Sequence, residues 1–275
     1  MPFIKSVQNN NDPVKIYYED SGKGKPVVFI HGWPLSGSMW EYQVTQLPQQ
    51  GLRCITYDRR GFGKSDRPFS GYDYDTMAGD LNALLDELNL NNVTLVGFSM
   101  GGGEIAKYFS LYEGARIAKV VLISAVVPYM LKTADNPDAV PQEVFDKMAK
   151  AMTGDRPTFL EGFNKDFYGV APGNSPVTDA YLNSALNKAM DASPVATIEC
   201  AKSFSSTDFR ADVVKINVPT LIIHGDKDKT VPIKPTGEAS AKLIKGSVLK
   251  VYKGAPHGLW FTDQEKLNQD LIDFI

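Results

Sequence analysis

The sequence of 275 residues predicts an α/β fold, with a mostly parallel central sheet flanked by helices and a helical insertion in its second half. Three observations predict this fold. Short runs of Val, Ile and Leu recur along the chain, segments with helical periodicity lie between them, and the alternation stops over residues 126–212 before it resumes. Alternating strands and helices are typical of parallel sheets whose crossover connections are right-handed.

Six apolar runs are the expected strands of the sheet. Most are almost continuous in Val, Ile and Leu, as in strands that are covered on both faces. They lie at residues 27–30, 54–57, 93–97, 120–124, 220–224 and 249–252. A weaker run at residues 15–18 alternates apolar and polar side chains, which is typical of an edge strand.

Helical patterns lie between these strands. In residues 76–88 the apolar positions recur with a period of about 3.6 residues, so one face of the helix is expected to pack on the sheet. The helices predicted in this way span residues 40–49, 76–88, 102–112, 236–244 and 264–275.

The break in the alternation contains helices but no convincing strand. Four helical segments are expected there, separated by glycines and prolines that interrupt helices. They span residues 141–152, 156–167, 178–190 and 194–203. Because strand signals resume at residue 220, we predict one domain over residues 1–275, with a helical cap at residues 126–212 inserted within it.

Composition excludes several classes of protein. The 29 Lys and Arg against 32 Asp and Glu give a net charge of −3, which argues against a nucleic-acid partner. The longest apolar stretch, residues 120–131, contains Ser124 and Pro128 and is too short to cross a membrane. Cys54 and Cys200 fit no metal or redox spacing, and the first six residues lack a secretory pattern. We therefore expect a cytoplasmic protein, and the cysteines indicate no metal site.

The segment Gly-Phe-Ser-Met-Gly at residues 97–101 follows a predicted strand and opens a predicted helix. This strand–turn–helix setting is typical of a nucleophile elbow, in which small residues flank the nucleophile because the turn is tight. Ser99 would then stand at a helix N-terminus, where free N–H groups favour a developing oxyanion.

A serine nucleophile needs a base and an orienting acid. The chain contains His31, His224 and His257. A common chain order is nucleophile, acid, histidine, and this order selects His257, in a loop after the last predicted strand. The loop after the preceding strand offers Asp226 and Asp228 as the acid. We favour Asp228 because Asp226 lies within the turn itself, where such side chains often bind the backbone.

An oxyanion hole needs two backbone N–H donors. Met100, the residue after the nucleophile, is the expected first donor. The second is expected from the loop after the strand at residues 27–30. Pro34 has no N–H, so Trp33 becomes the candidate. The polar loop at residues 58–66 lacks the spacing of a phosphate-binding loop, and we expect it to brace this end of the sheet.

Together these segments resemble the α/β-hydrolase superfamily over nearly the whole chain. Within it, the chain resembles the cofactor-free (non-haem) chloroperoxidases, also called perhydrolases, and the aryl esterases. The matching segments are residues 31–36 (HGWPLS), 57–65 (YDRRGFGKS), 97–103 (GFSMGGG), 207–210 (TDFR), 224–228 (HGDKD) and 255–258 (APHG). The resemblance implies the α/β-hydrolase fold, a catalytic triad of Ser99, Asp228 and His257, and oxyanion donors at Trp33 and Met100. It also implies that the reaction needs no metal and no cofactor.

The resemblance also implies a function. We expect a serine hydrolase that acts on small carboxylic esters or acids through an acyl-enzyme, and a perhydrolase when hydrogen peroxide replaces water. Proline at position 34 is typical of the perhydrolase-like members of the family. The expected substrate pocket is lined by Pro34, Val126, Phe163, Phe167, Phe204 and Val231.

Other readings of the same residues stay open. A lactamase or amidase of small cyclic amides would use the same triad, and a ligand receptor of this fold can keep one. Family members often assemble as trimers or hexamers, so the resemblance implies a homo-oligomer.

Overall fold

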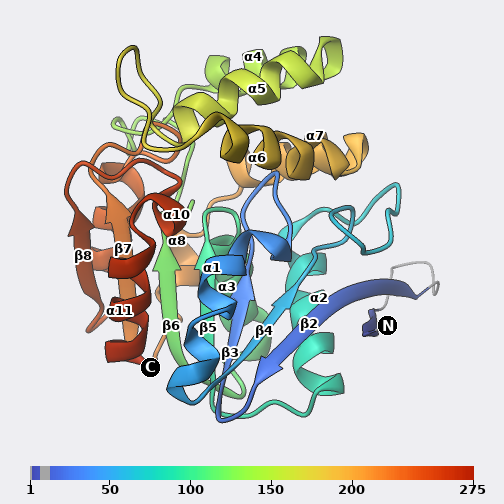
Figure 1. The fold of residues 1–275 in the computed structure, drawn as a ribbon. Helices are drawn as coiled ribbons and strands as arrows, with labels where there is room; N and C mark the ends of the chain where they lie inside the picture. The colour runs from blue at the N-terminus through green and yellow to red at the C-terminus, as the bar shows by residue number, and fades with distance from the viewer. Residues whose placement is uncertain (1, 7–12) are drawn as a thin grey trace.

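A computed structural model describes residues 2–6 and 13–275. Met1, the first of the six N-terminal residues that lack a secretory pattern, lies outside the described residues. One eight-stranded sheet has the order β1-β2-β4-β3-β5-β6-β7-β8. β1 and β2 pair antiparallel with their neighbours, and the other strands are parallel (Figure 1). The strands are β1 (Phe3–Ser6), β2 (Val14–Gly22), β3 (Lys25–Ile30), β4 (Leu52–Tyr57), β5 (Val93–Phe98), β6 (Ile117–Ile123), β7 (Thr220–Gly225) and β8 (Val248–Tyr252).

The apolar runs all form strands, and the differences lie at one edge of the sheet. β1 was not predicted, and β2 extends well beyond the predicted residues 15–18. These two strands pair with each other, with Ile4 opposite Ile16. Many of their residues are half-buried or exposed, so these strands lack the continuous apolar run that marks the central strands.

Helices cover both faces of the sheet and the edge at which the parallel strands end (Figure 1). The long helices are α2 (Tyr74–Glu87), α3 (Gly101–Tyr112), α4 (Gln142–Gly154), α5 (Arg156–Phe167), α6 (Asp179–Asp191), α7 (Pro194–Ser206) and α11 (Gln264–Phe274). The short ones are α1 (Glu41–Val44), α8 (Arg210–Val213), α9 (Ala239–Leu243) and α10 (Leu259–Thr262). In the described part of the chain, no helix has the length and apolarity needed to cross a membrane.

Capping side chains set where several helices begin. The Asp73 carboxylate accepts a hydrogen bond from the Thr76 amide at the start of α2, and Asp155 accepts one from Thr158 at the start of α5. Ser193 caps α7 in the same way. Each such cap satisfies an N–H group that the helix itself leaves unpaired.

Two predicted helices are interrupted, and both predictions were wrong in this respect. Residues 40–49 form a 3-10 turn η1 (Gly37–Trp40), α1 and a second turn η2 (Leu47–Gln50). Pro48 lies at the start of η2, where it has no N–H to continue a helix from α1. Residues 236–244 form a wide turn η3 (Lys234–Glu238) and then α9.

The core has two layers, one on each face of the sheet. Val27 and Phe29 of β3 pack in a cluster with residues of η1 and α11. Val28 and Ile30, the alternate residues of the same strand, pack in a cluster with α2 and α3. Because successive side chains of a strand point to opposite faces, both sides of β3 must be apolar. This is why its sequence is a continuous apolar run.

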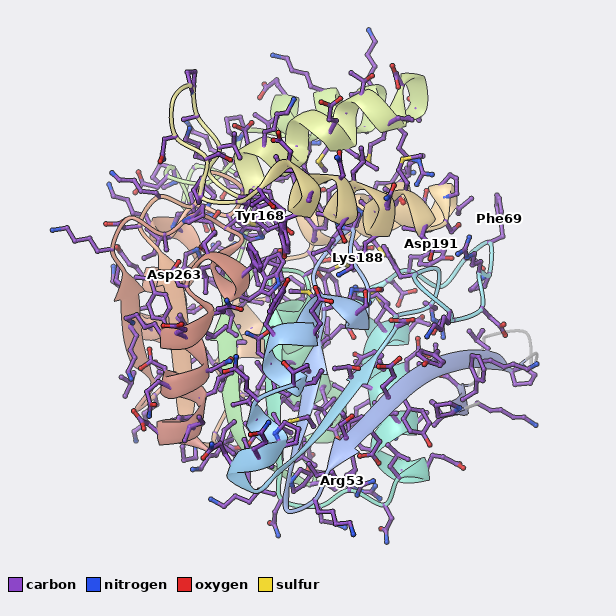
Figure 2. The ribbon with its side chains drawn as sticks, viewed as in Figure 1. Arg53, Phe69, Tyr168, Lys188, Asp191 and Asp263 are labelled. Atoms are coloured by element: carbon purple, nitrogen blue, oxygen red, sulfur yellow. The ribbon has the colours of Figure 1, made fainter. Side chains whose placement is uncertain are left out.

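Helices α4 to α7 lie over the edge of the sheet where β3 and β5 to β8 end (Figure 1). Tyr168, which follows α5, contacts Trp260 of α10 with 5.6 Å between ring centroids (Figure 2). Lys188 of α6 forms an ion pair of 3.4 Å with Glu41. That pair is exposed and contributes at most about 1 kcal/mol. The buried contact between Tyr168 and Trp260 therefore contributes more to holding these helices against the rest of the domain.

Candidate active site

Ser99 stands at the turn between β5 and α3. Its φ angle is 52°, a left-handed conformation that is costly for a residue with a side chain and is enriched at functional sites. A Cβ atom built on Gly101 would lie 2.7 Å from the Ile30 carbonyl oxygen, and one built on Gly97 would lie 2.8 Å from the Gly101 carbonyl oxygen. Glycine at both positions therefore lets the chain turn sharply and present Ser99 at the edge of the sheet.

Three buried side chains from three loops form one hydrogen-bonded line. His257 Nε2 lies 3.0 Å from Ser99 Oγ, and His257 Nδ1 lies 2.6 Å from Asp228 Oδ2. The loops follow β5, β7 and β8, whose ends meet at the same edge of the sheet. Since an ionised carboxylate only accepts hydrogen bonds, Nδ1 carries the proton and Nε2 is free to accept the Ser99 hydroxyl. This arrangement suits a nucleophile, a general base and an orienting acid.

The Asp228 carboxylate is held by more than His257. Its Oδ1 atom accepts hydrogen bonds from the amides of Thr230 at 3.0 Å and Val231 at 2.7 Å. Burial raises the pKa of Asp228, but the interactions with His257 and His224 outweigh burial and hold the pKa well below its usual range. The acid therefore stays ionised at neutral pH and can stabilise an imidazolium.

The two other candidates in this region fix loops. Asp226 Oδ1 accepts a hydrogen bond of 2.6 Å from the amide of Gly254 and does not contact the imidazole line. His224 Nε2 lies 2.9 Å from the Val231 carbonyl oxygen and donates to it, and it lies 3.4 Å from Asp228 Oδ2. The sequence order did not indicate that a second histidine contacts the acid.

Two aromatic rings hold the His257 imidazole. Phe98 contacts it with 4.8 Å between ring centroids, and Phe167 does so with 4.6 Å. Phe167 was expected in the substrate pocket, but it does not line the pocket and packs against His257 instead. Phe98 was missed, because an aromatic residue at this position of the motif gives no sign of which ring it faces.

The two expected oxyanion donors lie beside the nucleophile. A Cβ atom built on Gly32 would lie 3.1 Å from Ser99 Cβ, so the loop that carries Trp33 passes directly against Ser99. The peptide bond between Trp33 and Pro34 is cis. In the described part of the chain, no protein acceptor is recorded for the amides of Trp33 and Met100, which leaves both N–H groups available to a ligand.

A buried ion-pair cluster lies next to this loop. The Arg59 amide donates to His31 Nε2 at 2.9 Å, and the Arg59 guanidinium donates to the His31 carbonyl oxygen at 2.8 Å. The same guanidinium pairs with Glu104 of α3, which also accepts a 2.5 Å hydrogen bond from the Tyr57 hydroxyl. Burial and the Arg59 charge hold the pKa of His31 well below its usual value, so this imidazole is neutral. The cluster connects the oxyanion loop to the helix that follows Ser99.

The polar loop at residues 58–66 braces the end of the sheet that carries Ser99, as expected. Asp58 Oδ1 accepts a hydrogen bond of 2.8 Å from the Gly37 amide, and its Oδ2 accepts one of 2.8 Å from the Lys64 amide. Arg60 forms a buried pair of 2.6 Å with Asp80 of α2. No motif indicated that Arg59 contacts both the oxyanion loop, at His31, and helix α3, at Glu104.

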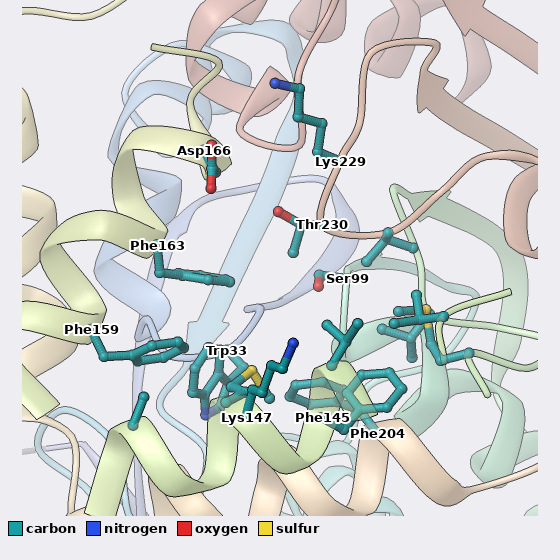
Figure 3. A pocket seen from close by; sticks show the side chains of 17 residues that line it. Trp33, Ser99, Phe145, Lys147, Phe159, Phe163, Asp166, Phe204, Lys229 and Thr230 are labelled. Atoms are coloured by element: carbon teal, nitrogen blue, oxygen red, sulfur yellow. The ribbon is translucent and has the colours of Figure 1, made fainter. Parts of the chain in front are cut away.

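A pocket of about 420 Å³ opens beside Ser99 (Figure 3). Apolar and aromatic residues make up most of its wall, and α4, α5 and α7 contribute many of them. The lining residues are Trp33, Ser99, Val126, Met130, Val140, Val144, Phe145, Lys147, Met148, Ala151, Phe159, Phe163, Asp166, Phe204, Lys229, Thr230 and Val231. The Trp33 ring contacts Phe163 and Phe204, with 5.2 Å and 5.7 Å between ring centroids.

The pocket contains four of the six residues expected to line it, namely Val126, Phe163, Phe204 and Val231. Pro34 is buried in the oxyanion loop and, like Phe167, is not among the lining residues. The contribution of α4 was missed. The sequence identifies an amphipathic helix there, but which of its side chains enter the pocket depends on how the helix docks over the sheet.

Comparisons with known proteins identify the family of the chain. The model of the alpha/beta hydrolase fold family matches residues 25–264. A putative non-heme chloroperoxidase from Synechocystis is 45% identical over 100% of both chains. A bifunctional esterase/perhydrolase from Acinetobacter calcoaceticus is 39% identical over 96% of this chain and 97% of its own. The crystal structure of a bromoperoxidase from Bacillus anthracis superposes with a TM-score of 0.94 at 47% identity, covering 99% of each chain. The chain therefore belongs to the α/β hydrolase fold family.

Proposed function

We propose that this protein is a serine hydrolase of small carboxylic esters that also acts as a perhydrolase when hydrogen peroxide replaces water. One observation carries the proposal: Ser99, His257 and Asp228 are joined by hydrogen bonds of 3.0 Å and 2.6 Å beside a largely apolar pocket. The relatives named chloroperoxidase and esterase/perhydrolase support it.

In the first half of the reaction, His257 Nε2 removes the Ser99 hydroxyl proton as Oγ attacks the ester carbonyl. The amides of Trp33 and Met100 bind the oxyanion of the tetrahedral intermediate. When this intermediate collapses, the bond to the alcohol oxygen breaks, and the imidazolium gives its proton to the leaving alcohol. An acyl group remains bound to Ser99, and Asp228 has stabilised the imidazolium throughout.

In the second half, His257 takes a proton from water or from hydrogen peroxide as that molecule attacks the acyl carbonyl. The bond to Ser99 Oγ breaks, and Oγ recovers the proton. Water gives a carboxylic acid, and peroxide gives a peracid. A released peracid can transfer one oxygen atom to a halide ion and become the carboxylic acid, so halogenation needs no group beyond the triad.

The alternatives are not favoured. A lactamase or amidase would use the same triad, but the relatives described above are named for peroxidase, esterase and perhydrolase activities. A ligand receptor has no need for an ionised acid hydrogen-bonded to a histidine that in turn reaches a serine. Hydrolysis of a neutral ester by the wild type, lost when Ser99 is replaced, would exclude the receptor function.

We also propose that residues 126–212 act as a cap within one domain of residues 1–275. The lining of the pocket by α4, α5 and α7 supports this proposal.

A cytoplasmic location is likewise a proposal. It is supported by the two free cysteines, Cys54 and Cys200, since disulfides are rare in a reducing cytoplasm. A homo-oligomer, a trimer or a hexamer, is proposed from the family resemblance alone.

The perhydrolase branch is tested at Pro34. We propose that the Trp33 carbonyl accepts a hydrogen bond from hydrogen peroxide and that Pro34 sets the direction of this carbonyl. In Pro34→Leu, peracid formation relative to acid formation from one ester is expected to fall about two- to tenfold, the effect of one lost hydrogen bond. Both products are measured in the same reaction at a fixed peroxide concentration.

Pro13→Leu is the matched control, because Pro13 is exposed and precedes β2. Its product ratio is expected to equal that of the wild type. A Pro34→Leu variant with an unchanged ratio would show that this position does not govern the choice between peroxide and water.

A further inference from the structure

One side chain in the pocket is not used by the proposed chemistry. Lys147 lies on α4, and Figure 3 shows it extending from this helix into the pocket wall. The rest of that wall is largely apolar, including its neighbours Phe145 and Met148. Lys147 is exposed, so water solvates its ammonium in the free protein. Because the ammonium donates three hydrogen bonds and accepts none, an anionic group of a ligand in the pocket can replace some of that water.

The structure gives Lys147 no anionic protein partner among the residues it describes. Glu143 lies one helical turn earlier, at a spacing that commonly forms ion pairs. On the adjacent helix α5, Lys165 and Glu161 do pair at this spacing, at 2.8 Å. No ion pair of Lys147 is recorded in the described part of the chain, and its side chain turns to the pocket instead.

Two other charges lie at the pocket, Asp166 and Lys229. Figure 3 draws both of them above Ser99 and draws Lys147 below it. Asp166 and Lys229 have opposite signs and offset each other in the field that a ligand experiences. The charge left over is that of Lys147, so the pocket favours a ligand that carries a negative charge.

We propose that the enzyme prefers acyl groups that carry a second, anionic group, a carboxylate at the far end of the chain from the reacting carbonyl, and that Lys147 binds this carboxylate. This inference rests on the proposed function. The anion is placed in the acyl part of the substrate because the acyl group stays on Ser99 through both halves of the reaction. A contact with it is therefore kept from the bound ester through the acyl-enzyme, and is made equally in the ground and transition states.

The test compares paired substrates. The mono(4-nitrophenyl) esters of adipic, pimelic and suberic acid carry a free carboxylate, and their methyl 4-nitrophenyl diesters have the same chain without the charge. These chains are long enough to limit attack of the carboxylate on its own ester. For each variant the measured quantity is kcat/KM for the acid divided by kcat/KM for the methyl ester.

At the best-fitting chain length, this ratio is expected to be about fivefold lower in Lys147→Gln than in the wild type, the upper end for an exposed ion pair. The change should lie mainly in KM, because the contact is made equally in the ground and transition states. Lys147→Arg keeps the charge and should retain most of the ratio. Raising the ionic strength should narrow the difference between the wild type and Lys147→Gln.

Lys150→Gln is the matched control, since Lys150 is an exposed residue of α4 that does not line the pocket, and its ratio should equal that of the wild type. Equal ratios in the wild type and Lys147→Gln at all three chain lengths would overturn the inference while leaving the proposed function in place. Failure of the wild type to hydrolyse even the methyl esters would overturn the proposed function, and this inference with it.

Discussion

Replacement of Ser99 by alanine is expected to reduce ester hydrolysis on the order of 10⁶-fold, because no other group takes over as the nucleophile. The fold should be retained. Alanine adopts the left-handed φ of 52° at much the same cost as serine, and the Ser99 amide keeps its 2.9 Å hydrogen bond to the Ile123 carbonyl oxygen. The measurement is kcat/KM for 4-nitrophenyl acetate, together with thermal unfolding.

Two further variants separate chemistry from conformation. Ser99→Gly should be equally inactive but more stable than Ser99→Ala by about 1 kcal/mol, because glycine adopts a positive φ without strain. Ser206→Ala, at an exposed position of α7, should keep full activity. If Ser99→Ala retained substantial turnover above background, Ser99 would not be the nucleophile.

Replacement of Arg59 by methionine is expected to lower the free energy of unfolding by about 3–5 kcal/mol, the usual effect of breaking a buried ion pair. The variant leaves the Glu104 carboxylate, which is fully buried, without its counter-charge. It also removes the 2.8 Å hydrogen bond from the guanidinium to the His31 carbonyl oxygen, next to the oxyanion loop. Unfolding in urea measures the effect.

Arg53 provides the matched control for this variant. It pairs with Asp20 at 2.6 Å, but both side chains are about 30% exposed, so Arg53→Met should cost no more than about 1 kcal/mol. Figure 2 shows Arg53 at the opposite end of the sheet from the cap helices. Arg59→Met combined with Glu104→Leu should recover part of the lost stability, because no unpaired charge is then buried. Equal costs for Arg59→Met and Arg53→Met would contradict the role assigned to the cluster.

In Arg59→Met, we also expect kcat for ester hydrolysis to fall more than KM rises. The oxyanion donors act on the tetrahedral intermediate and less on the bound ester, so their displacement affects mainly the chemical step. A general loosening of the fold would instead raise KM and lower the fraction of active enzyme together.

The central strands and the order of the candidate site residues could be predicted from the sequence, for a physical reason. A strand covered on both faces is mostly apolar on both of them, as residues 27–30 of β3 and most residues of β5 show. A sharp turn around Ser99 requires glycine on both sides. Both requirements are local, so they leave a local pattern.

Features that depend on how distant segments dock could not be predicted in this way. Phe163 and Phe167 lie one turn apart on α5, yet one lines the pocket and the other packs on His257. The pairing of Arg59 with Glu104 joins residues 45 positions apart. No periodicity in the sequence specifies either contact, because each depends on the position of one element against another.

The central claim is that a single acyl group on Ser99 is shared between water and peroxide. The most direct test is rapid mixing with 4-nitrophenyl acetate at several peroxide concentrations, with mass analysis of the quenched protein. We predict an acetyl group on Ser99, a ratio of peracetic to acetic acid that rises in proportion to peroxide, and a kcat/KM for the ester that does not depend on peroxide. An unmodified Ser99 during turnover, or a product ratio that ignores the peroxide concentration, would contradict the claim.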